Sequence, residues 1–169
     1  MKNAVAIEAP FSTSYVDRLM TTVPSAIPAT IYADTSFFVS LYLTDRHTAE
    51  VERRLISPPS LWMTPLHIAE WAHAVEQHVF RKAISRSQAD RLLRRFQEHR
   101  ARNLWREAPL PDRALEICAE LAHRHAARLG VRTLDTLHVA SALELGAGHF
   151  WTFDTRQAKL ALAAGLNTG

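Results

Sequence analysis

The sequence contains little cysteine and little glycine, and each shortage excludes a class of site. Cys118 is the single cysteine among 169 residues, so an internal disulfide and a cysteine-based zinc site are both excluded. We expect Cys118 on the apolar face of a helix. Only five glycines occur, with neither a Walker loop nor a G-x-G-x-x-G motif. A glycine-rich phosphate cradle is therefore not expected.

Long hydrophobic runs are also missing. No apolar run is long enough to cross a bilayer, and residues 1–29 lack the apolar core of a signal peptide. We therefore expect a cytoplasmic protein without a membrane partner. We interpret residues 1–29 as a leader of uncertain structure, followed by one domain over residues 30–169.

Positive charge is only slightly in excess. The net charge of +3 is weak evidence for an anionic partner. The stretch 86–106 is more informative, because it carries seven arginines against two acids. We identify Arg91, Arg94 and Arg95 as candidates to contact nucleic-acid phosphates. A solvated helix face is the alternative interpretation of this charge run.

Strand-like and helix-like segments alternate along the chain, which predicts a parallel sheet with helices on both faces. The expected strands span 31–33, 61–63, 103–108 and 149–153. The expected helices span 37–44, 64–82, 113–129, 133–145 and 155–164, with one more capped by Asp45 and an arginine-rich one that starts at Ser87.

Two of the strand-like runs end in the same Asp-Thr pair. Asp34 follows the run 31–33, and Asp154 follows the run 149–153 about 120 residues later. Open α/β sheets bind ligands at the carboxyl ends of their strands. We therefore predict that two neighbouring strands direct these acids toward one site. The alternative for each is a helix N-cap, since aspartate accepts a hydrogen bond from an unpaired helix N–H.

Two helices contribute further acids. Glu70 lies among apolar residues in the helix 64–82, and Asp135 opens the apolar helix 133–145 with His138 on the same face. An unpaired buried charge is costly, so pairing with a nearby Arg or His is the alternative to a catalytic role for Glu70. For His138 we favour a core histidine hydrogen-bonded to a neighbour over a catalytic one.

Four carboxylates at one site would repel each other and raise one another's pKa values. A divalent cation relieves this repulsion, and Mg²⁺ and Mn²⁺ prefer oxygen ligands. Such an ion can lower the pKa of water and stabilise the leaving oxygen in a phosphodiester displacement. The four acids are therefore candidate ligands for Mg²⁺ or Mn²⁺.

Four segments of the chain resemble the motifs of the PIN domain, and in particular those of VapC-type toxins of bacterial toxin–antitoxin pairs. They are YADTS (32–36), TPLHIAEW (64–71), RTLDTLHVASA (132–142) and WTFDTRQA (151–158). The resemblance covers about residues 30–166. It implies a three-layer α/β/α fold with a central, mainly parallel sheet of four to five strands, and a metal-dependent endoribonuclease toxin.

The resemblance also implies roles for individual residues. Asp34 and Asp135 would be the principal metal ligands, while Glu70 and Asp154 would complete the catalytic site directly or through waters. Ser36 and Thr152 occupy positions where the family often has supporting hydroxyls.

Partners follow from the same resemblance: an RNA substrate, a cognate antitoxin whose C-terminal segment enters the acidic groove, and a second copy in a homodimer. The chain departs from the family pattern at Thr155, Arg156 and Gln157, where the family often has an aromatic residue.

Two other classes of function fit parts of the sequence. One is a magnesium-dependent phosphotransfer enzyme with an aspartate nucleophile, but its usual second Asp is replaced here by Ser36. The other is a non-catalytic nucleic-acid-binding module in which the acids act as caps and ion pairs. Mn²⁺ binding distinguishes this module from a nuclease.

Overall fold

The structure is a computed structural model that describes residues 30–56 and 59–168, so the predicted leader lies outside the described residues. The elements in chain order are β1 (Thr30–Ala33), α2 (Thr35–Tyr42), α3 (Thr48–Arg54), β2 (Ser60–Met63), α4 (Pro65–Phe80), α5 (Arg86–Ala101), β3 (Arg106–Glu107), α6 (Ala114–Leu121), the π-helical η1 (Ala122–Ala126), α7 (Ala127–Leu129), α8 (Thr133–Glu144), β4 (His149–Trp151), α9 (Thr155–Ala163) and β5 (Asn167–Thr168).

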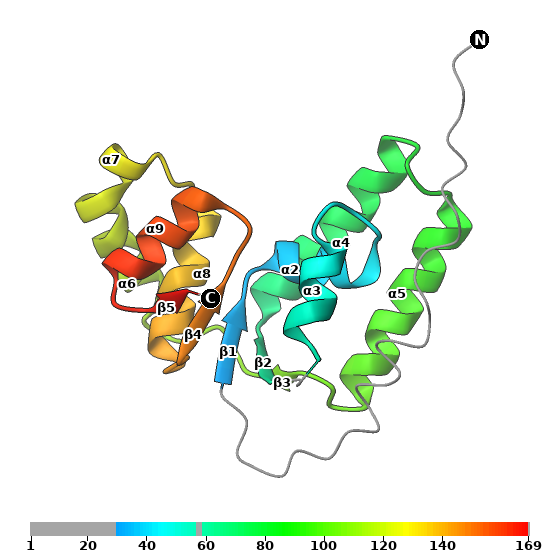
Figure 1. The fold of residues 1–169 in the computed structure, drawn as a ribbon, viewed down its shortest axis with the longest axis horizontal. Coiled ribbons are helices and arrows are strands. Elements are labelled where there is room, and N and C mark those ends of the chain that lie inside the picture. The colour runs from blue at the N-terminus through cyan, green and yellow to red at the C-terminus, as the bar shows by residue number, and fades with distance from the viewer. Residues whose placement is uncertain (1–29, 57–58, 169) are drawn as a thin grey trace.

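The described strands form one parallel sheet in the order β3-β2-β1-β4-β5 (Figure 1). The predicted mainly parallel sheet of four to five strands is confirmed. The strand order reverses beside β1, with β2 and β3 on one side and β4 and β5 on the other. The carboxyl ends of β1 and β4 therefore flank a topological switch point, the place where open α/β sheets bind ligands.

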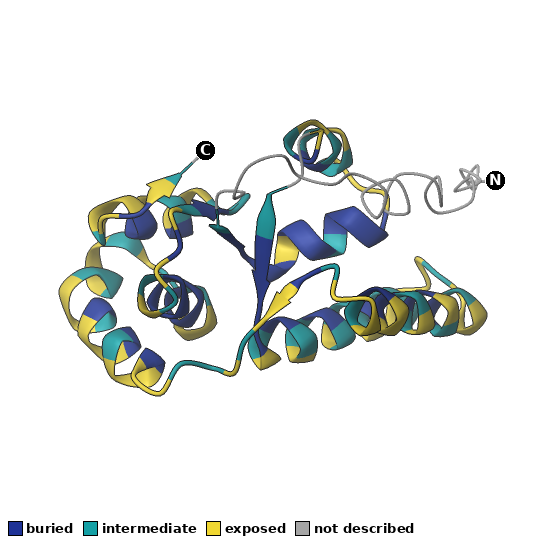
Figure 2. Cartoon of the chain, turned by 90° about the horizontal axis from the view of Figure 1, so that it is seen from below, coloured by how far each residue is buried: buried dark blue, intermediate teal, exposed yellow. Residues whose placement is uncertain are grey.

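Alternating side chains of the strands build two separate cores. Ile31 and Ala33 of β1 face a cluster with α2, α4 and α5, while Tyr32 between them faces a cluster with α6, α8 and α9. Figure 2 shows the buried strands between these two groups of helices. This arrangement is the predicted three-layer α/β/α fold.

Several predicted features of the helices are present in the structure. Thr64 is the N-cap of α4, with Pro65 at its first position. Gly130 follows α7 in the left-handed conformation, with φ of 66°. Cys118 is buried on α6, and burial raises the pKa of its thiol. Among the helices of the described residues, none is long and apolar enough to span a membrane.

Some helix starts differ from the prediction. The arginine-rich α5 begins at Arg86, one residue before the predicted Ser87, and Ser85 is its N-cap, since the Ser85 side chain accepts a hydrogen bond from the Gln88 N–H. Asp45 does not cap a helix: it accepts a hydrogen bond from the His47 N–H in the turn that precedes α3.

The strand boundaries differ from the prediction at two places. The expected strand 103–108 shrinks to β3, because Asn103 takes a left-handed conformation with φ of 54° and Trp105 turns into the core. The two-residue β5 was not predicted, since so short a strand has no alternating pattern to detect.

Candidate active site at the carboxyl ends of β1 and β4

Asp34 leaves β1 at the switch point and is the N-cap of α2. Its carboxylate accepts hydrogen bonds from the Ser36 hydroxyl at 2.6 Å, the Thr152 hydroxyl at 2.9 Å and the Phe37 N–H at 3.3 Å. The residue is only 8% exposed, and burial raises the pKa of its carboxyl group. Within residues 30–56 and 59–168, no arginine or lysine forms an ion pair with it.

β1 and β4 are neighbours, as the paired Asp-Thr ends predicted. Ala33 is in register with Trp151, and the Asp34 N–H donates to the Trp151 carbonyl oxygen at 2.9 Å. This pairing places Thr152, the first residue after β4, against the Asp34 carboxylate. Cap and ligand are therefore compatible roles for Asp34, because the N-cap bond occupies only part of the carboxylate.

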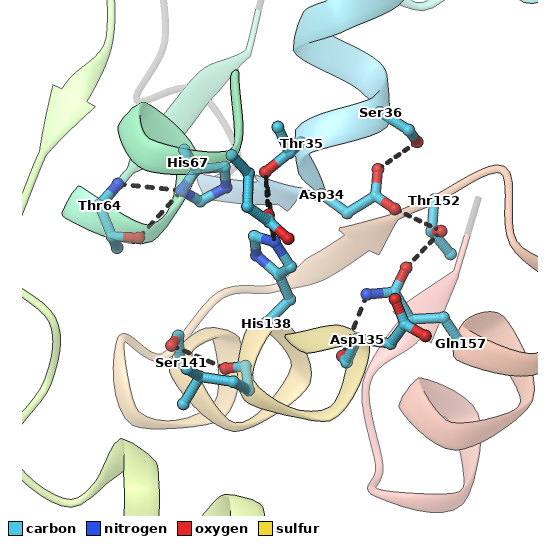
Figure 3. A network of polar contacts seen from close by, with 12 residues as sticks. Asp34, Thr35, Ser36, Thr64, His67, Asp135, His138, Ser141, Thr152 and Gln157 are labelled. Carbon is cyan, nitrogen blue, oxygen red and sulfur yellow. Dashed lines mark hydrogen bonds and ion pairs between the residues drawn. The ribbon is translucent and has the colours of Figure 1, made fainter. Parts of the chain in front are cut away.

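Gln157 is a site residue that the sequence reasoning missed. It lies on α9, is 1% exposed, and its Oε1 is 2.6 Å from the Thr152 Oγ1. Its Nε2 donates to the backbone carbonyl oxygen of Asp135 at 3.0 Å. Figure 3 shows Thr152 and Gln157 joining the Asp34 side to the Asp135 side of the site. The one available signal was the departure from the aromatic residue common in the family.

Asp135 occupies the first turn of α8, where the helix dipole favours negative charge. Its Oδ2 accepts a hydrogen bond from the Arg132 N–H at 3.1 Å. Its Oδ1 has no hydrogen-bond partner in the part of the chain that the structure describes. One oxygen of Asp135 is therefore available to a ligand.

Glu70 reaches the site from α4 and pairs with His138 of α8. Its Oε2 lies 2.5 Å from the His138 Nε2 and accepts the Thr35 hydroxyl at 2.6 Å. The Tyr32 hydroxyl lies 2.9 Å from the other ring nitrogen, Nδ1. Burial raises the pKa of Tyr32, so its hydroxyl stays protonated. In the His138 tautomer with its proton on Nε2, the ring donates to Glu70 and accepts the Tyr32 hydroxyl at Nδ1.

The structure contains the contacts that the alternative interpretations of Glu70 and His138 predicted. Glu70 has the predicted histidine partner, and His138 is a buried histidine, 3% exposed, bonded to its neighbours. Burial acts to raise the pKa of Glu70, but the hydrogen bonds from His138 and Thr35 lower it more, so it lies below the usual 4.5. Glu70 therefore stays ionised and held by its partners.

Between pH 7 and pH 3, Glu70→Gln is expected to lose less of its free energy of unfolding than the wild type does. Because the pKa of Glu70 is lowered by folding, its contribution to the free energy of unfolding is complete above pH 4.5 and disappears as the pH falls through the lower folded value. We expect Glu70→Gln to cost about 1–2 kcal/mol at pH 7 and less at pH 3. Urea unfolding at both pH values measures this difference.

The matched control is Glu76→Gln, which removes an exposed ion pair with Arg86 and is expected to leave the stability nearly unchanged at either pH, because water screens an exposed pair. If Glu70→Gln and the wild type lost equal stability between pH 7 and pH 3, the Glu70 contacts would not stabilise the fold.

Asp154 uses its carboxylate mainly as the N-cap of α9. It accepts the Arg156 N–H at 2.7 Å and the Gln157 N–H at 3.1 Å, and the Arg156 guanidinium lies 3.5 Å away. Burial acts to raise its pKa, but these bonds from Gln157 and Arg156 outweigh it and lower the pKa. The predicted cap is confirmed, and the negative charge of the carboxylate is balanced by the nearby Arg156 guanidinium.

The four acids are near one switch point, but they do not form a closed metal cage. Across residues 30–56 and 59–168, no three Asp, Glu, His or Cys side chains are placed to hold one ion together. Mg²⁺ usually keeps several waters and is held by one or two carboxylates. Asp34 is buried and has no cationic partner among the described residues, and Asp135 has a free oxygen there, so both suit such an ion.

The arginine-rich α5 lies away from the acids. It packs on the same face of the sheet as α4, whereas α8 and α9 cover the opposite face (Figure 1). Arg91 and Arg94 are exposed and Arg95 is partly buried. Other arginines of the run form ion pairs, such as Arg100 with Glu107 at 2.8 Å. The phosphate-contact role of Arg91, Arg94 and Arg95 stays a prediction.

A groove of about 610 Å³ opens beside the acids, between α2, α4 and the start of α8. Its polar lining consists of Thr35, Ser36, Ser40, Asp45, His47, Glu70 and His73. The other lining residues include an apolar group: Val39, Leu66, Ala69, Ala74 and Leu134. A ligand in this groove would contact an apolar wall and the candidate catalytic site together.

The fold and this site define a class: an α/β domain with carboxylates gathered at the switch point of a parallel sheet. The sequence model of the PIN domain matches residues 31–162, so the chain belongs to the PIN domain family. The search of curated proteins gave no significant match.

Solved structures with the same fold include three from bacteria. VapC20 of Mycobacterium tuberculosis, a sarcin–ricin loop cleaving toxin, is 20% identical, with a TM-score of 0.60 over 80% of this chain and 95% of its own. VapBC2 of Rickettsia felis, bound to a DNA fragment from its promoter, is 14% identical, with a TM-score of 0.59 over 83% and 97%. FitAcB of Neisseria gonorrhoeae is 18% identical, with a TM-score of 0.56 over 82% and 95%.

Proposed function

We propose that this PIN-domain protein is a metal-dependent endoribonuclease toxin that a cognate antitoxin neutralises. The observation that carries the proposal is the pair Asp34 and Asp135 at the switch point, joined through Thr152 and Gln157. Membership of the PIN domain family supports the same reading.

Each polar residue of the site then has a role. Asp34 and Asp135 would hold Mg²⁺ or Mn²⁺, and Glu70 and Asp154 would complete the site directly or through waters. The ion supplies Lewis acidity at the phosphate and lowers the pKa of water. Ser36 and Thr152 orient the Asp34 carboxylate through their hydroxyl hydrogen bonds.

The substrate that we propose is single-stranded RNA in a loop of a structured molecule. Specific RNA recognition usually falls on such loops, because their unstacked bases are accessible. The name of VapC20 as a sarcin–ricin loop cleaving toxin supports this choice by analogy of fold. Arg91, Arg94 and Arg95 would contact phosphates distant from the cleaved bond.

The antitoxin would bind in the groove beside the acids. Its apolar residues, with Leu134 at 47% exposure, suit an apolar segment, and the acidic Glu70 in its lining suits a cationic side chain. Such a segment would cover the acids and exclude RNA. We also propose a homodimer, for which the exposed Phe80 at the end of α4 is a candidate contact.

Metal removal tests the activity. Purified protein without antitoxin is incubated with a mixed cellular RNA pool in Mg²⁺ or Mn²⁺, with and without EDTA. We expect discrete products whose rate of formation falls by at least about 10²-fold in EDTA and returns with excess metal. A mock purification controls for contaminating ribonucleases, and sequencing the product ends identifies the target.

Two outcomes would contradict the proposal. Cleavage that is undiminished in EDTA would exclude a metal-dependent mechanism. The absence of cleavage by folded protein with either metal would favour the non-catalytic binding module.

A further inference from the structure

We propose that Gln157 is a positioning residue that sets the distance between Asp34 and Asp135, and thereby the affinity of the site for its divalent cation. This inference rests on the proposed function, because it assigns Gln157 a role in the same metal site.

Gln157 contacts both sides of the site from a third element. Its Oε1 lies 2.6 Å from the Thr152 hydroxyl, which follows β4 and also lies 2.9 Å from Asp34. Its Nε2 donates at 3.0 Å to the backbone of Asp135, at the start of α8. One side chain on α9 and one just after β4 therefore join the two candidate ligands, which are 101 positions apart in the chain (135 minus 34).

The orientation of the amide follows from its partners. The Asp135 carbonyl oxygen can only accept, so it must face the Nε2 donor. The Oε1 then faces Thr152, whose single hydroxyl proton is shared between Oε1 at 2.6 Å and the Asp34 Oδ2 at 2.9 Å, while its oxygen accepts the Asp154 N–H at 3.0 Å. An apolar side chain of the same volume would fill the space without holding either partner.

The burial of Gln157 makes this link rigid. At 1% exposure its amide has no water to replace a lost protein partner. Residues that orient metal ligands without contacting the metal typically contribute about 10–100-fold to metal affinity or activity. Holding the first turn of α8 against the end of β4 is such a role, since α8 carries Asp135 and β4 leads into Thr152.

Gln157→Met tests the proposal, because methionine keeps the length and volume of the side chain but removes both hydrogen bonds. The dissociation constant for Mn²⁺, measured by calorimetry on the full chain, is expected to rise about 10-fold. The control is Ser141→Ala on α8, the helix that carries Asp135; it removes a buried hydrogen bond to the Leu137 carbonyl oxygen without touching the acids. It is expected to leave the Mn²⁺ dissociation constant unchanged.

Thr152→Val tests the other end of the link, and it replaces Gln157→Met as the test if Gln157→Met does not fold. It is expected to weaken Mn²⁺ binding by a similar factor. If the two residues act as one link, their effects are not additive. The Mn²⁺ dissociation constant of the double variant should then exceed that of the weaker-binding single variant by at most about 3-fold.

The outcomes separate this inference from the function on which it rests. A wild-type protein that does not bind Mn²⁺ would overturn the proposed function. A second outcome would overturn only the positioning role of Gln157: Mn²⁺ binding is lost in Asp34→Asn but unchanged in folded Gln157→Met. If Gln157→Met does not fold, unchanged binding in Thr152→Val has the same meaning.

Discussion

Asp34→Asn is expected to lower the rate of RNA cleavage by at least about 10³-fold, because the ion that Asp34 is proposed to hold would account for several kcal/mol of transition-state stabilisation. Asparagine is as good an N-cap as aspartate, so the Phe37 N–H keeps its acceptor. It lacks the negative charge that a hard cation requires. The fold is therefore expected to persist while metal binding is lost.

Single-turnover cleavage of a loop-containing RNA measures the rate, and circular dichroism and urea unfolding measure the fold. Burial raises the pKa of the Asp34 carboxyl, so neutral asparagine is expected to keep the metal-free stability within about 1 kcal/mol of the wild type. Asp45→Asn is the matched control, since Asp45 lines the same groove but bonds Ser40 and the His47 N–H. Near-normal cleavage by Asp34→Asn would refute its role as a metal ligand.

His138→Leu is expected to lower the free energy of unfolding by about 2–3 kcal/mol at pH 7. Leucine fills the apolar surroundings but removes the acceptor of the Tyr32 hydroxyl and the closest donor to Glu70. Tyr32 is fully buried, and a buried polar group without its partner is costly. RNA cleavage is expected to fall as well, because Glu70 loses its fixed position.

Urea unfolding of His138→Leu and of Tyr32→Phe/His138→Leu separates the two contacts. Removing both partners of a buried hydrogen bond is often nearly neutral, so the double variant is expected to recover about 1 kcal/mol relative to His138→Leu. If His138→Leu were as stable as the wild type, the Tyr32–His138–Glu70 contacts would be incidental to folding.

The four acids show where sequence reasoning succeeds and where it ends. Asp34 and Asp154 were expected both as caps and as ligands, because one carboxylate suits either use. The structure separates them: Asp34 is buried and forms no ion pair with any described residue, while Asp154 is bonded to its own helix and to Arg156. This difference depends on burial, which no local pattern encodes. The metal and RNA roles of both remain predictions.

The partners of the site residues could not be predicted from spacing. Glu70 meets His138 across 68 positions, and Gln157 meets Asp135 across 22. A side chain at the start of a helix can point to several neighbours, and only the packing of α4, α8 and α9 around β1 and β4 selects one. His138 was correctly expected to be a hydrogen-bonded core residue, but its partner was not identified.

The sequence by itself determined the alternation of strands and helices, the parallel sheet, most of the caps and the positions of the four acids, because each depends on residues close in the chain. The tertiary structure alone decided the strand order that places β1 beside β4, the short β3 and β5, and the link from Asp34 through Thr152 and Gln157 to Asp135. These features arise from contacts between distant segments, whose geometry follows from packing rather than from periodicity.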